Sequence, residues 1–97
     1  MATQPTQANP WRAQLGAWLQ AVAAEAQLFP NDLGNVVQRH RQGFPPSTWY
    51  SFWARLLWRD AAKWLLKTAI QEAAQQAGVQ LTPEAADLIA GIAVDFL

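Results

Sequence analysis

Apolar residues recur three or four positions apart over most of the chain, which is the spacing of one face of an α-helix. No segment alternates apolar and polar residues between turn signals, as a half-buried strand would. Caps and prolines set the ends of each periodic segment. The sequence therefore predicts an all-α fold, a small bundle of about four helices over approximately residues 10–28, 32–41, 48–77 and 83–96.

Start and stop signals are clearest at the first and last of these helices. Asn9 is placed to cap the first helix, Pro10 stands at its first position, and Phe29-Pro30 ends it. Thr82-Pro83-Glu84 combines an N-cap, a proline and a first-turn acid at the start of the last helix. Between them, Ser47 or Thr48 is expected to begin the third helix, and Gly43 and Gly78 to end the second and third.

The first nine residues differ from the rest of the chain. Residues 1–9 are small and polar, include Pro5, and have almost nothing to bury. We therefore expect an extended polar arm, followed by a single helical domain over residues 10–97. Arms of this kind are ordered by a neighbouring chain, so the arm itself suggests an assembly.

The composition narrows the functional classes. Of the 97 residues, 7 are Lys or Arg and 7 are Asp or Glu, and charged residues make up 14% against about 25% in an ordinary soluble domain. So few charges give a free monomer little colloidal protection. The absence of cysteine excludes disulfides and thiolate chemistry. With no signal peptide and no transmembrane run, we expect an intracellular protein, in the cytoplasm or within a virion or other large complex.

Six tryptophans are the most unusual feature of the composition: Trp11, Trp18, Trp49, Trp53, Trp58 and Trp64. A core of this size cannot easily enclose six indoles with every N–H bonded. We expect Trp11 and Trp18 to close the bundle from the first helix. The other four are expected at an interface, where tryptophan is a frequent hot-spot residue.

The third predicted helix carries both tryptophans and cations. Its basic residues Arg55, Arg59, Lys63 and Lys67 follow one another at steps of four and form one stripe. Trp53, Leu57, Ala61 and Trp64 are expected on a different face of the same helix. Acids gather in the C-terminal part, at Glu72, Glu84, Asp87 and Asp95, and we expect them to pair with the stripe, within the chain or between copies.

Four roles compete for this helix. It is a core helix whose cationic stems cover apolar surface, or it docks on a partner protein, and these two roles are compatible. Alternatively it lies on a membrane surface, with indoles inserted and cations at anionic headgroups. A role in following phosphates is the least favoured, because the net charge of the chain is zero.

Catalytic equipment is sparse. Arg39-His40-Arg41 invites a role for His40, but no second histidine, cysteine or clearly paired acid accompanies it in the sequence, so we interpret it as a lone surface histidine. Glu84 and Asp87 share a helix face, yet acids in a first helical turn have a structural reason to be there. No glycine-rich phosphate loop is present. We expect no catalytic, cofactor or metal site.

These observations predict a non-enzymatic helical structural or adaptor subunit of a larger protein assembly, with a phage virion component as the favoured case. Its partners would be other protein subunits, as a homo- or hetero-oligomer, contacted through the arm and the tryptophan-rich basic helix. The expected partner-binding residues are Trp49, Trp53, Trp58, Trp64, Arg55, Arg59, Lys63 and Lys67. The alternative is a peripheral membrane-associated protein that uses the same helix.

Overall fold

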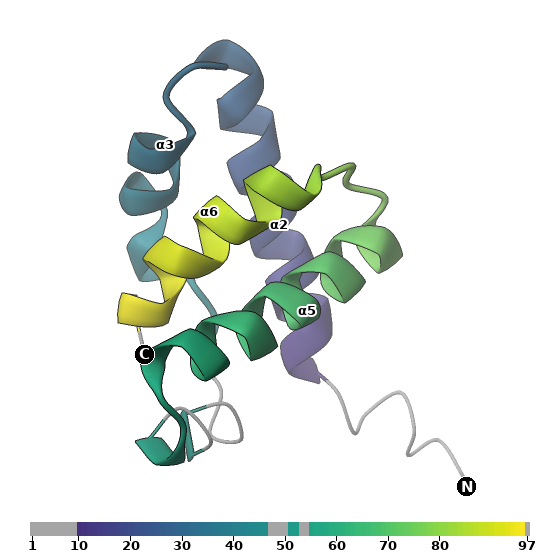
Figure 1. Cartoon of the computed structure of the whole chain (residues 1–97). Helices are drawn as coiled ribbons and strands as arrows, with labels where there is room; N and C mark the ends of the chain where they lie inside the picture. Colours follow the sequence, from purple (N-terminus) through teal and green to yellow (C-terminus); the bar gives the residue numbers. More distant parts are fainter. Residues whose placement is uncertain (1–9, 47–50, 53–54, 97) are drawn as a thin grey trace, which may run out of the picture.

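The computed structural model of the chain describes residues 10–46, 51–52 and 55–96. In this part the chain forms four α-helices and no strand, numbered here as in Figure 1. They are α2 (Pro10–Leu28), α3 (Leu33–Arg39), α5 (Arg59–Ala77) and α6 (Pro83–Ala93), with short 3-10 turns at Arg41–Gly43 and Val94–Phe96. The predicted all-α fold is confirmed. The expected arm, residues 1–9, lies outside the described residues.

Helix α2 and helix α5 pack closely because small residues face each other where they meet. A Cβ atom built on Gly16 of α2 would lie 3.1 Å from the Cβ of Ala77 and 3.3 Å from the carbonyl oxygen of Ala73. A larger side chain at Gly16 would push the helices apart. Beside this contact, the side chain of Gln20 donates a hydrogen bond of 2.9 Å to the carbonyl of Ala77.

The core lies where α5 and α6 meet α2 and α3, as Figure 1 shows. Its largest fully buried side chains are Leu15, Leu19, Leu66, Ile70, Ile89, Val22, Val36 and Val37. The other buried residues of α5 are alanines, and their small side chains let neighbouring helices pack closely. An aromatic row closes one end, with Phe44 edge-on to both Trp18, at 5.0 Å, and Phe96, at 5.6 Å.

Most of the predicted helix ends agree with the structure. Helix α2 spans the predicted residues and ends before Phe29-Pro30. The Thr82 side chain caps α6 by accepting a hydrogen bond of 3.0 Å from the backbone N–H of Ala85. Gly78 ends α5 in the left-handed conformation, with φ of 77°, which glycine adopts without a Cβ penalty.

The prediction of one helix over residues 48–77 is wrong. Trp58 has an extended backbone, with φ of −64° and ψ of 156°, and α5 begins only at Arg59. Residues 51–52 and 55–56, before the break, are also helical, and α5 follows it. No proline or glycine marks the break. The first buried residue of α5 is Ala62, and none of residues 55–61 is buried, so little burial holds these residues in line with the helix.

The end of the second helix also differs from the prediction. Helix α3 ends at Arg39, and the chain continues through His40 into a 3-10 turn that ends at Gly43. Gly43 does not have a positive φ, and so it is not the predicted left-handed cap. The side chain and the carbonyl of His40 both bond to α2, as described below, and these contacts turn the chain one residue after the helix.

Candidate functional site

Three exposed large apolar side chains lie just before α5 and in its first two turns, while Leu28, at the end of α2, is 74% exposed. Trp58 is 87% exposed, Trp64 is 63% exposed and Leu56 is 61% exposed. We call these three residues the tryptophan surface. Burial of an indole removes a large apolar area from water and is therefore favourable. An exposed indole does not gain this free energy within its own chain. The exposure therefore marks a surface that is available to a partner.

The other tryptophans divide into two groups. Trp18 is buried and its indole N–H donates a 2.8 Å hydrogen bond to the carbonyl of His40. Trp11 is partly buried and donates to the carbonyl of Pro45 at 3.1 Å. Both thus close the bundle from the first helix, as the sequence predicts. The predicted contact residues Trp49 and Trp53 lie outside the described residues.

The basic stripe is largely paired with the acids of α6 and the turn after it. Arg59 forms hydrogen bonds of 2.6 and 3.0 Å with the two carboxylate oxygens of Asp95. Lys63 lies 3.2 Å and Lys67 lies 3.8 Å from oxygens of Asp87. The expected pairing between the stripe and the C-terminal acids therefore occurs within the chain for Asp87 and Asp95, whereas Glu72 pairs with Arg12 of α2. Arg55 is exposed.

These pairs make the charge around α5 nearly neutral. The Arg59 guanidinium lowers the pKa of the Asp95 carboxyl, and Asp95 in turn raises the pKa of Arg59. Both side chains are more than half exposed, so the pair contributes little to stability. The pairs have a larger effect on the electrostatic potential near the stripe. An approaching anion meets three cations that already have carboxylate partners.

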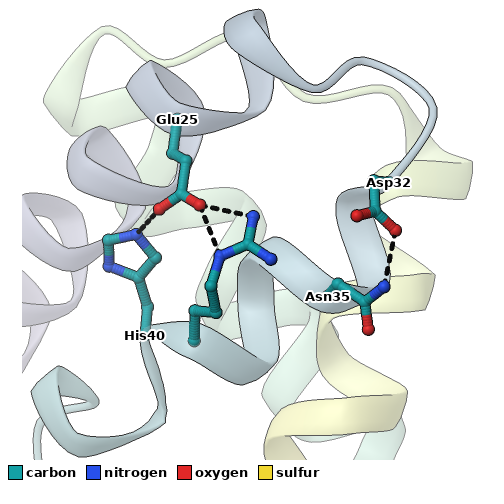
Figure 2. A network of polar contacts seen from close by, with 5 residues as sticks. Glu25, Asp32, Asn35 and His40 are labelled. Carbon is teal, nitrogen blue, oxygen red and sulfur yellow. Dashed lines mark hydrogen bonds and ion pairs between the residues drawn. The ribbon is translucent and has the colours of Figure 1, made fainter.

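A polar network joins α2 to the end of α3, as Figure 2 shows. The carboxylate of Glu25 accepts a hydrogen bond of 2.7 Å from Nε of Arg39 and lies 2.7 Å from Nε2 of His40. Arg39 and His40 lower the pKa of the Glu25 carboxyl. The interpretation of His40 as a lone surface histidine without a paired acid is thus wrong. The partner lies 15 residues away on another helix, where sequence spacing gives no signal.

The charged side chains of this network bond mainly to one another. Each of its charged side chains is used to bond another, and Arg39 also stacks over the Phe29 ring, with its Cζ 5.5 Å from the ring centroid. No hydroxyl or thiol nucleophile is bonded to His40 among the described residues. Likewise, Asp87 is occupied by Lys63 and Lys67. We interpret the network as a structural link between two helices.

Neither a metal-binding cluster nor a membrane-spanning helix is found in the described part of the chain. Within residues 10–46, 51–52 and 55–96, no group of three or more His, Cys, Asp or Glu side chains is placed to hold a metal ion. No helix there is long and apolar enough to cross a bilayer.

A cleft of about 290 Å³ lies between the second half of α2 and the start of α6. Buried core side chains form its floor, and the chain before α3 and before α6 completes its wall. Its apolar lining includes Leu19, Val22, Ala26, Leu33, Leu81 and Ile89. In the sequence these residues have the spacing of ordinary core positions, so nothing there distinguishes a cleft from a filled interior.

Comparison with known proteins adds no relative: no protein-family model, no curated protein and no solved structure matches this chain.

Proposed function

We propose that this chain is a non-enzymatic helical subunit of a larger protein assembly, a structural or adaptor protein that docks through the tryptophan surface. The observation that carries the proposal is the 87% exposure of Trp58, with Trp64 and Leu56 also more than half exposed. Buried tryptophans supply much of the binding energy at protein interfaces, which makes these residues suitable anchors.

The low charge of the chain supports the same proposal. Its formal net charge is zero, and 14% of its residues are charged. Charged residues are depleted in the centres of protein interfaces, whereas a free monomer needs them for solubility. A chain that is permanently assembled with other subunits depends less on surface charge for its solubility.

A protein partner is favoured over a membrane surface by the pairing of the cations. Attachment to anionic lipid draws about 1 kcal/mol from each free Lys or Arg near the surface. In this chain Arg59, Lys63 and Lys67 already face Asp95 and Asp87. These two carboxylates therefore offset part of the attraction to headgroups, whereas burial of an indole against protein does not depend on free cations.

The proposal is tested by the size at which the chain migrates in a gentle extract of its own cells. We expect the full-length chain to elute far above its 10.8 kDa mass, and a Trp58→Ala/Trp64→Ala double variant to elute as a monomer. Leu88→Ala is the matched control, since Leu88 is an exposed apolar residue of α6 outside the tryptophan surface. It should elute like the wild type.

Elution of the wild type as a monomer would overturn the proposal. Flotation of the chain with anionic vesicles, lost at high salt, would instead assign it to the membrane surface. The phage virion role and the intracellular location stay predictions, which mass spectrometry of purified particles and cell fractions would test.

A further inference from the structure

The molecule carries an exposed aromatic side chain at one end of α5 and an apolar cleft at the other. Trp58 immediately precedes α5. The cleft is lined by Gln80 and Leu81, which follow the end of that helix, and by residues of α2 and α6. Helix α5 has 19 residues, which separates its two ends by about 27 Å at 1.5 Å per residue. Trp58 therefore cannot reach the cleft of its own chain.

The cleft has the size of one aromatic side chain. A cavity of about 150 Å³ lined by aliphatic residues holds one benzene molecule. Indole exceeds benzene by one fused ring, and the cleft measures about 290 Å³. Sites for small-molecule ligands commonly begin at about 300 Å³. One inserted tryptophan side chain therefore fits within the cleft.

The chemistry of the two parts is also complementary. No charged side chain lines the cleft, and its polar lining groups within the described chain are the amides of Gln27 and Gln80. Two acids stand beside it in the sequence, Glu84 before Ala85 and Asp32 before Leu33. Trp58, in contrast, has arginines near it in the sequence.

Of these arginines, Arg55 is exposed, whereas Arg59 is paired with Asp95. An apolar side chain with the cation of Arg55 three residues before it thus corresponds to an apolar cleft whose lining has acids next to it in the sequence. This arrangement matches the general rule that charge complementarity at the rim of an interface steers association and sets register.

We propose that copies of this chain associate head to tail, with Trp58 of one copy inserted in the cleft of the next. The proposal rests on the proposed function, and it names the partner of the tryptophan surface as a second copy of the chain. Such a contact is heterologous, so each copy keeps one free Trp58 and one free cleft until the assembly closes or ends.

A mixing experiment tests this arrangement with purified full-length protein. Trp58→Ala removes the inserted side chain, and Ala23→Glu places a charge in the lining of the cleft at a partly exposed position of α2. In sedimentation velocity we expect the wild type to self-associate and each variant alone to be monomeric. The equimolar mixture should form one 1:1 complex that does not grow, because it contains a single intact contact.

Two further measurements keep the test interpretable. Circular dichroism and thermal unfolding establish that both variants are folded. Ala26→Phe, which fills the cleft from a neighbouring turn of α2, replaces Ala23→Glu if the latter does not fold. We expect Trp58→Ala to weaken self-association about 30-fold or more, as removal of an interface hot spot does.

Three outcomes would overturn the proposal: a wild type that stays monomeric when pure, a mixture of folded variants that stays monomeric, or an Ala23→Glu variant that associates as the wild type does. The same measurements distinguish failure of this contact from failure of the proposed function. A pure monomer that elutes in a large complex from the cell extract overturns the head-to-tail contact and leaves the assembly role standing, whereas a monomer in both settings overturns both.

Discussion

The indole of Trp18 and the backbone of His40 form the bond that joins the first helix to the end of α3. The Trp18 Nε1–H donates to the His40 carbonyl at 2.8 Å, while the His40 ring lies 2.7 Å from the carboxylate of Glu25. Both partners of His40 belong to α2. Its backbone and its side chain thus hold the same helix at two points, one of them beside the buried ring of Phe44.

Replacing Trp18 by Phe is expected to destabilise the fold by about 0.5–1.5 kcal/mol, because the carbonyl of His40 loses the indole donor and keeps only the backbone N–H of Gly43, while most of the apolar contact remains. Urea unfolding monitored by circular dichroism measures the change. Trp58→Phe serves as control, since that indole is 87% exposed and its loss should change stability by less than about 0.5 kcal/mol. Equal effects of the two substitutions would contradict a role for the Trp18 hydrogen bond.

Gly16→Ala is expected to lower stability, although alanine normally stabilises a helix by about 1 kcal/mol relative to glycine. The added Cβ would lie 3.1 Å from the Cβ of Ala77, and such overpacking typically costs about 1–3 kcal/mol. Gly91→Ala is the matched control. Its Cβ would meet only the flexible side chain of Lys63, at 3.5 Å or more.

We expect Gly91→Ala to be neutral or stabilising in the same thermal unfolding measurement. The double variant Gly16→Ala/Ala77→Gly should recover part of the loss, because it removes the opposing methyl group. A stabilised Gly16→Ala protein would mean that α2 and α5 are not in close contact at this point.

The charge of Glu25 makes stability depend on pH in a defined direction. Its pKa is lowered from the ordinary value of 4.5 by Arg39 and His40, so its carboxylate stabilises the folded state above that value. This contribution is lost as the pH falls through the lowered pKa. The difference in Tm between the wild type and Glu25→Gln should therefore be constant near about pH 7 and shrink below about pH 4.5. A difference that stays constant in acid would show that the carboxylate charge is not its source.

Removing the acids that face the basic stripe should create attraction to anionic surfaces. Asp87→Asn/Asp95→Asn frees Lys63, Lys67 and Arg59 from their carboxylate partners. We expect this variant to float with anionic vesicles at low salt and to be released at high salt. The control is Asp32→Asn/Glu84→Gln, which changes the net charge equally but removes no carboxylate that pairs with Arg59, Lys63 or Lys67. Equal flotation of both variants would show that net charge alone, and not the pairing, decides the result.

The sequence alone determined the helical class and the ends at which local chemistry is strong. Pro10, Thr82 and Gly78 act through their own backbone or through bonds to residues a few positions away, so their roles can be recognised without a tertiary structure. The buried Trp18 and the pairing of cations with C-terminal acids were also predictable. Both follow from helical spacing and from charge segregation along the chain.

Only the tertiary structure decided where the third helix begins and what surrounds His40. Residues 55–62 have no helix breaker, yet the backbone of Trp58 is extended and α5 begins only at Arg59. Glu25 meets His40 because α2 and α3 fold together, and the cleft lies where residues of α2, α6 and the segments before α3 and α6 come together. Each of these features depends on contacts between segments distant in sequence. The local spacing of residues does not indicate which distant segments meet.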